Sequence, residues 1–148
     1  LSGLVGSEMC IRDRMYAAPG VGLAAPQVAV NKRVIVVDTA SGEALPSPIQ
    51  MVNPELIESS DEWAAYDEGC LSFPDQYAEV ERPAKVRVRY VDYHNKVQEI
   101  EAVGLLSTCI QHEMDHLDGK LFIDRISMLK RNIILRKMNK LKKNEILK

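Results

Sequence analysis

Runs of apolar residues predict several extended segments. Val34–Val37 is continuously apolar, which predicts a buried strand. Lys85–Val91 and Val97–Val103 alternate apolar and polar residues, the two-residue period of a half-buried strand, and the polar turn between them predicts a hairpin. Ile49–Ile57 contains Asn53-Pro54, so we expect two extended pieces separated by a turn.

Helical periodicity replaces the two-residue period after the hairpin. From Leu105 to His116 the apolar residues Leu105, Cys109 and Ile110 recur at spacings of four and five, and Gly119 follows as a C-terminal cap. A second helix is predicted over about residues 127–145, with a rough apolar stripe among lysines and arginines: Leu129, Ile133, Ile134, Met138 and Leu141. The pattern predicts an α+β fold, in which antiparallel strands pack around a central helix and a C-terminal helix follows.

The composition fits one ordinary domain. The chain has 148 residues, 46% of them hydrophobic and 27% charged. No stretch approaches the roughly 20 apolar residues that span a bilayer. Its three cysteines, Cys10, Cys70 and Cys109, lack paired spacing, which argues against disulfides and for a reducing compartment. A cytoplasmic protein is therefore expected, with Cys109 packing as a small buried hydrophobe.

The net charge of −2 conceals a strong asymmetry. Between Glu55 and Glu81 there are nine acids and no lysine or arginine, whereas Arg125–Lys148 holds nine basic residues and one acid. The acidic stretch is interpreted as a solvated face. The basic terminal helix can instead follow phosphate groups, which predicts binding to a polyanion such as ribosomal RNA.

A metal-binding motif lies on the predicted central helix. His112 and His116 are four residues apart, so both imidazoles lie on one helical face and can reach one metal ion. Glu113 projects beside them. A metal lowers the pKa of water and a neighbouring carboxylate moves its proton, which is the chemistry of amide hydrolysis. The alternative is an accidental spacing of two unrelated histidines.

Cys70 is the best candidate for a third ligand. One protease pattern places a histidine where this chain has Phe122, which disfavours that class. The acidic residues that follow His116 are also poor candidates for the third ligand. Upstream, a glycine-containing segment carries Cys70 and can bend to meet the helix. Cysteine with two histidines leaves an open fourth position for catalysis, and such a set suits zinc, iron, nickel or cobalt.

Three motifs in order resemble the peptide deformylase family. They are Gly20–Gln27 (Gly-Val-Gly-Leu-Ala-Ala-Pro-Gln), Glu68–Ser72 (Glu-Gly-Cys-Leu-Ser) and Gln111–Leu117 (Gln-His-Glu-Met-Asp-His-Leu). The first alone is a weak signal for a nucleotide loop, and its value lies in the combination. The resemblance runs from about Met15 to the end and is closest to the bacterial form with a long basic C-terminal helix.

The resemblance implies a reaction and its residues. The enzyme would remove the formyl group from N-terminal formyl-methionine of new proteins and release formate, with ferrous iron as the most favoured metal. Cys70, His112 and His116 would hold the metal. Glu113 would carry the proton, while the Gln27 amide and the Leu71 backbone N–H would stabilise the oxyanion. The expected substrate pocket includes Val21, Gly22, Glu68, Leu105 and Cys109, and either Asp115 or Glu68 would orient an imidazole.

The first residues fall outside this resemblance. Leu4–Arg14 is similar to the translated end of a transposase-type sequencing adapter. We therefore expect residues 1–14 to be a non-native scar and residues 15–148 to form one catalytic domain that lacks its natural N-terminal segment. A genuine N-terminal loop or a weak signal peptide is the alternative, although the apolar run is far too short for the latter.

Two other functions remain open at this point. One is a metalloprotease that cleaves peptide bonds. The other is a non-catalytic metal-binding protein that docks on ribosomes through its basic helix. Neither a membrane nor DNA is an expected partner. Activity on formyl-methionyl peptides separates the deformylase from both.

Overall fold

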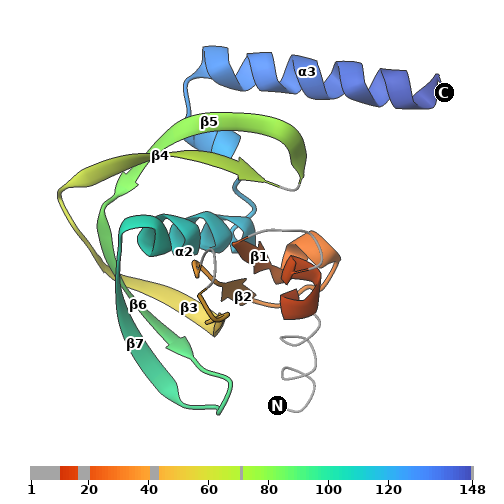
Figure 1. Cartoon of the computed structure of the whole chain (residues 1–148). Coiled ribbons are helices and arrows are strands. Elements are labelled where there is room, and N and C mark those ends of the chain that lie inside the picture. The colour runs from red at the N-terminus through yellow and green to blue at the C-terminus, as the bar shows by residue number, and fades with distance from the viewer. Residues whose placement is uncertain (1–10, 17–20, 41–43, 71, 148) are drawn as a thin grey trace.

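The computed structural model describes residues 11–16, 21–40, 44–70 and 72–147 (Figure 1). Its strands are β1 (Gly22–Ala24), β2 (Val34–Val37), β3 (Ile49–Ser59), β4 (Trp63–Cys70), β5 (Phe73–Pro83), β6 (Lys85–Val91) and β7 (Val97–Val103). Its helices are the short 3₁₀ turns η1 (Ala25–Val28) and η2 (Phe122–Arg125), the central helix α2 (Gly104–Leu117) and the terminal helix α3 (Met128–Ile146).

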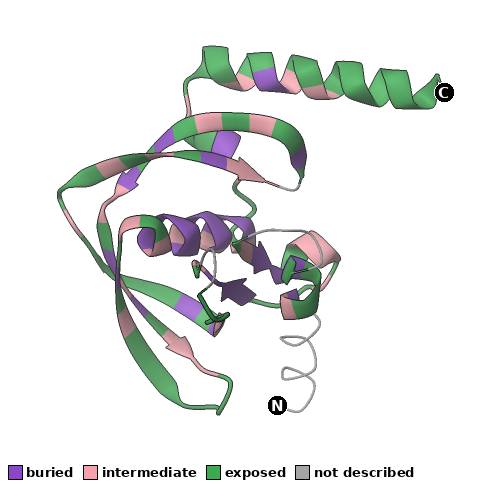
Figure 2. Cartoon of the chain, viewed as in Figure 1, coloured by how far each residue is buried: buried purple, intermediate pink, exposed green. Residues whose placement is uncertain are grey.

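Helix α2 lies between two layers of antiparallel strands (Figure 1). One layer is a five-stranded sheet in the order β1-β2-β3-β6-β7, and the other is the β4–β5 hairpin. Figure 2 shows α2 largely buried between them. The predicted α+β fold, with strands around a central helix, is thereby confirmed. Gly119 follows α2 in a left-handed conformation (φ 74°), which favours glycine, and donates its N–H to the His116 carbonyl.

Strand β2 is buried on both faces, which explains its continuous apolar run. Ile35 and Val37 belong to the core cluster beneath α2, where they meet Met51 and Ile110. Val34 and Val36 belong to a second cluster on the opposite face. An alternating pattern would have left one of these clusters without its apolar side chains.

The second cluster includes a helical segment at residues 11–16. Ile11 and Met15, one helical turn apart, are fully buried there with Leu23 and Ala25. Ile11 falls within the stretch predicted to be a scar. The other residues of that stretch up to residue 10 lie outside the described part of the chain.

The prediction for Ile49–Ile57 was wrong in one respect. The segment is a single strand, β3, and not two pieces separated by a turn. Its pairing with β6 shifts register between Val52 and Glu55, and Asn53 has a φ of 50°. Such a bulge accommodates Pro54, which has no N–H to give to the ladder, without ending the strand.

Helix α3 packs on the hairpin through few of its residues (Figure 2). Ile134 is buried against Phe73, Val80 and Phe122, and Met138 is partly buried beside it. The rest of the predicted stripe is wrong, since Leu129 is 72% exposed and Ile133 and Leu141 are also exposed. Ser127 caps the helix by accepting a hydrogen bond from the Lys130 N–H. Within the described ranges, no helix is long and apolar enough to cross a membrane.

Candidate metal centre

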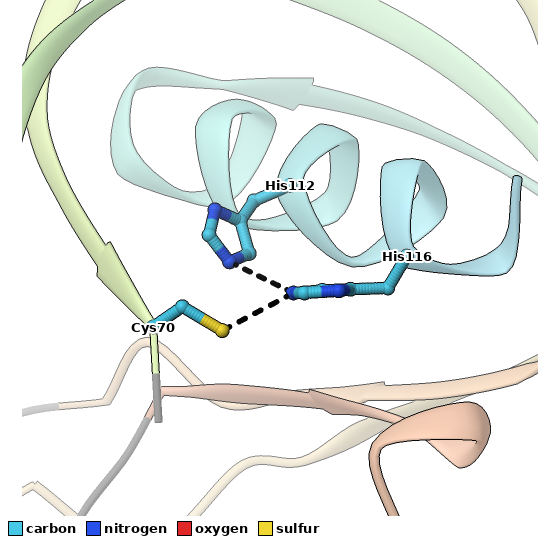
Figure 3. A group of neighbouring side chains, drawn as sticks. All are labelled: Cys70, His112 and His116. Carbon is cyan, nitrogen blue, oxygen red and sulfur yellow. Dashed lines mark hydrogen bonds between the residues drawn. The ribbon is translucent and has the colours of Figure 1, made fainter. Parts of the chain in front are cut away.

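The two histidines of α2 and the cysteine of β4 converge on one point (Figure 3). His112 Nε2 and His116 Nε2 are 3.3 Å apart, and Cys70 Sγ is 3.4 Å from His116 Nε2. The three possible ligand atoms all lie within 4.8 Å of one another. This is the set predicted from the sequence, although Cys70 ends a strand and does not lie in a bent loop.

A register shift in the hairpin brings Cys70 to the histidines. Gly69 pairs with Tyr77, but Cys70, the next residue, pairs with Phe73. Residues 74–76 of β5 therefore bulge out of the pairing beside Cys70, and the Cys70 side chain points toward α2 (Figure 3). Bulges of this kind often redirect a side chain beside a functional site.

The chemistry of these donors fits a divalent metal. His112 Nδ1 lies 2.7 Å from Glu68 Oε1, so Nδ1 donates to the carboxylate and Nε2 is the nitrogen that faces the possible metal position. Burial disfavours the Cys70 thiolate, but hydrogen bonds from His112 and His116 outweigh this effect and lower the thiol pKa to about 5. The same pairing raises the pKa of His112 to about 10, against the opposing effect of burial. A metal would replace the shared protons.

Glu68, and not Asp115, is the carboxylate that orients an imidazole. Besides His112 it binds Arg82 with both oxygens, at 2.7 and 2.9 Å. Asp115 turns away to Arg82 and Arg125. Neither arginine is evident from the sequence, because nothing in their spacing from the motifs marks them.

Glu113 is buried beside the two histidines. Its Oε2 has no hydrogen-bond partner among the described residues, and burial raises its pKa to about 7 against the charges of His112 and His116. Gly22 leaves the space that the carboxylate occupies, because a Cβ there would lie 2.7 Å from Glu113 Oε1. An unpaired, buried carboxylate of this kind is suited to exchanging a proton with a bound molecule.

Gln27 presents its amide N–H to the centre. Its Oε1 accepts from the Ala24 N–H at 2.8 Å, which leaves Nε2 to point at Cys70 Sγ, 3.3 Å away. The amide therefore offers a neutral donor that is already oriented. The second predicted donor, the Leu71 N–H, lies outside the described residues.

A pocket of about 550 Å³ opens onto these groups. All five predicted pocket residues line it: Val21, Gly22, Glu68, Leu105 and Cys109. Val21 and Leu105 form its rim, each 46% exposed. Burial raises the pKa of the Cys109 thiol to about 12, so this cysteine is a neutral wall residue, as predicted.

Comparison with known proteins identifies the family. The sequence model of the polypeptide deformylase family matches residues 5–132. The chain is 54% identical over 131 residues to a peptide deformylase of Mesorhizobium japonicum, covering 88% of this chain and 74% of that protein. It is 53% identical over 135 residues to one of Pelagibacter ubique, covering 91% and 78%.

Solved structures agree with the sequence relatives. The peptide deformylase of Ehrlichia chaffeensis superposes with a TM-score of 0.90 at 32% identity, covering 97% of this chain and 86% of that one. The peptide deformylase of Legionella pneumophila gives 0.82 at 44% identity, covering 93% and 80%. With its Cys/His/His group, its buried glutamate and these relatives, the chain belongs to the polypeptide deformylase family, metal-dependent enzymes that remove the N-formyl group from newly made proteins.

Proposed function

We propose that this site hydrolyses the formyl amide of N-terminal formyl-methionine and that Cys70, His112 and His116 hold the metal. The observation that carries the proposal is the convergence of one sulfur and two nitrogen atoms within 4.8 Å, beside a buried carboxylate with an unpaired oxygen. Three protein ligands and an accessible pocket are typical of catalytic, rather than structural, metal sites.

The metal that we propose is ferrous iron, with zinc, nickel or cobalt able to replace it. One thiolate and two imidazoles suit each of these ions. When bound, such a metal supplies Lewis acidity, polarising a carbonyl group and lowering the pKa of water. The family resemblance supports iron as the physiological choice.

Glu113 would transfer the proton, and Gln27 would stabilise the oxyanion. Glu113 accepts a proton from the attacking water and delivers it to the amine as the C–N bond breaks, so that formate and a free N-terminus leave. Gln27 and the Leu71 N–H donate to the oxygen that gains negative charge. One oxyanion donor contributes about 3 to 4 kcal/mol in comparable enzymes.

The pocket supports a substrate with an apolar first side chain. Val21 and Leu105 form the rim of the pocket and Cys109 is part of its wall, while Gly22 leaves room for the Glu113 carboxylate. The methionine side chain would enter here while the peptide continues past the rim. Glu68 contributes to the wall, but its carboxylate is engaged by His112 and Arg82.

A turnover assay tests the proposal. Anaerobically purified protein should release formate from formyl-Met-Ala-Ser, and Glu113→Gln should keep the metal while losing roughly 10²- to 10⁴-fold in kcat. Near-wild-type turnover in Glu113→Gln with verified metal would contradict the role of Glu113. Cleavage of internal peptide bonds without formate release would favour the metalloprotease instead.

We also propose that α3 brings the enzyme to the ribosome. The helix carries most of the basic residues of Arg125–Lys148, and Arg136, Lys137 and Lys140 are exposed on it. In Figure 1, α3 lies on the other side of the β4–β5 hairpin from α2, which carries both histidines, so a polyanion can bind the exposed side of α3 without covering the pocket.

Finally, we propose that residues 1–14 are a scar attached to a catalytic domain of residues 15–148. The similarity of Leu4–Arg14 to a translated adapter supports this division. Replacing residues 1–14 by the matching segment of the Mesorhizobium japonicum relative should then raise the melting temperature, because Ile11 is the one residue of the described range 11–14 that packs in the cluster containing Met15. Equal melting temperatures would contradict the proposal.

A further inference from the structure

A continuous series of hydrogen-bonded charges joins His112 to the end of η2, two residues before the N-cap of the C-terminal helix. It runs from His112 to Glu68, then to Arg82, Asp115 and Arg125. Successive contacts measure 2.7 Å (His112 Nδ1 to Glu68 Oε1), 2.7 Å (Arg82 Nε to Glu68 Oε2), 2.8 Å (Arg82 Nη1 to Asp115 Oδ2) and 2.9 Å (Arg125 Nε to Asp115 Oδ2).

The interior of this series cannot rearrange independently of its ends. The Glu68 and Arg82 side chains are only 5% and 3% exposed. Each arginine forms a two-pronged contact with a carboxylate: Arg82 with Glu68, and Arg125 with Asp115. Because Asp115 Oδ2 accepts from both arginines, displacing Asp115 also displaces Arg82. Arg82 in turn holds the carboxylate that orients His112.

Arg125 is the end of the series that reaches the surface. It is the last residue of η2, just before the Ser127 cap of α3, and its side chain is 38% exposed. We propose that Arg125 is a positioning residue of the metal centre: acting through Asp115, Arg82 and Glu68, it fixes the His112 ring and so couples the turn η2 to metal retention. This inference rests on the metal site proposed above.

The test measures metal release instead of turnover. Co²⁺ bound to Cys70 gives a thiolate charge-transfer absorption, so its loss to excess chelator can be followed directly. Arg125→Met should release Co²⁺ about tenfold faster than wild type. Removing a residue that supports a metal ligand typically weakens metal binding by about 10- to 100-fold, and Arg125 acts at a distance, so we expect the smaller value. Arg125→Lys keeps the charge but not the two-pronged contact, so its rate should fall between the two.

Arg131→Met provides the matched control. Arg131 is similarly exposed (37%) and pairs with Asp124 close by, outside the series. Its release rate should equal that of wild type. Equal rates in wild type and Arg125→Met would overturn the coupling, as would equal acceleration in Arg125→Met and Arg131→Met, which would indicate loosening of the whole C-terminal region. Absence of the charge-transfer band in wild type would instead refute the metal site itself, and the coupling with it.

Discussion

Gly22 and Glu113 fit together so closely that a Cβ on residue 22 would lie 2.7 Å from Oε1 and 2.9 Å from Cγ of the glutamate. Gly22 begins β1, whereas Glu113 belongs to α2. The missing side chain on the strand therefore defines where the buried carboxylate on the helix can lie.

This relationship predicts the effect of Gly22→Ala. The added methyl group must displace the carboxylate end of the Glu113 side chain. Because that end can move, the free energy of unfolding should change little. The carboxylate, however, leaves its place beside the metal ligands. We expect kcat to fall about 10²-fold, as for other small misplacements of catalytic groups, with metal content unchanged. Wild-type kcat in this variant would show that the position of Glu113 is not critical.

Removal of the sulfur ligand should remove the metal. In Cys70→Ala only His112 and His116 remain of the donor group, and a two-ligand site binds divalent ions weakly. Elemental analysis after dialysis should find little metal in this variant. Cys109→Ala is the control, since Cys109 is a buried thiol outside the ligand group. Stoichiometric metal in Cys70→Ala would place the third ligand elsewhere.

The Asp38 carboxylate should make the free energy of unfolding depend on pH, independently of the metal centre. The buried carboxylate accepts hydrogen bonds from the Tyr16 hydroxyl and the N–H groups of Ala40 and Ser47. Burial opposes ionisation, but these bonds prevail and hold the pKa of Asp38 below its ordinary 3.8. Because the folded pKa is the lower one, the contribution is present above pH 3.8 and is lost as the pH falls through the folded pKa.

Asp38→Asn tests this dependence. Urea unfolding of the metal-free protein should give Asp38→Asn a free energy of unfolding about 1–3 kcal/mol below that of wild type at about pH 6. The difference between the two proteins should be smaller at about pH 3. Asp61→Asn, which changes an exposed carboxylate, should follow the wild-type profile. If the free energy of unfolding of Asp38→Asn were lower than that of wild type by the same amount at every pH, the role of the ionised Asp38 carboxylate would be contradicted.

Charge reversal on α3 tests ribosome binding. Changing Arg136, Lys137, Lys140 and Lys143 to glutamate should abolish co-sedimentation with ribosomes, and wild-type binding should weaken steeply with added salt. Turnover of a free formyl-Met tripeptide should be unchanged, because these residues are exposed on α3, which lies on the other side of the β4–β5 hairpin from α2 (Figure 1). If the variant still sedimented with ribosomes at low salt, α3 would be only a solvated helix covering Phe122 and Val80.

The parts of the fold that the sequence predicted are those where burial and polarity agree. Val34–Val37 and the alternating strand β6 follow this rule. Helix α2 was predicted although most of its buried residues are polar, because its two histidines are spaced by one helical turn. The β4–β5 hairpin does not follow the rule. Its inward-facing positions include Glu68 on one strand and Arg82 on the other, so the buried face appears polar in the sequence.

The pairing of Glu68 with Arg82 also explains why the sequence did not predict the arginine at the site. A buried arginine is compatible with folding only because Glu68 and Asp115 neutralise it, and those partners are 14 and 33 residues away. No local pattern encodes a contact at that separation. The ligand residues were found because four-residue helical spacing and a three-motif resemblance are both visible in one sequence.

The ligand group is divided between two layers, which has a consequence for the dynamics of the hairpin. Cys70 belongs to β4, whereas both histidines belong to the helix that packs on the other sheet. An ion bound to all three would cross-link the layers, so local opening of the β4–β5 hairpin and loss of the ion would become a single event. Amide hydrogen exchange along β4 and β5 would then slow in proportion to metal occupancy, while exchange in β6 and β7 would not.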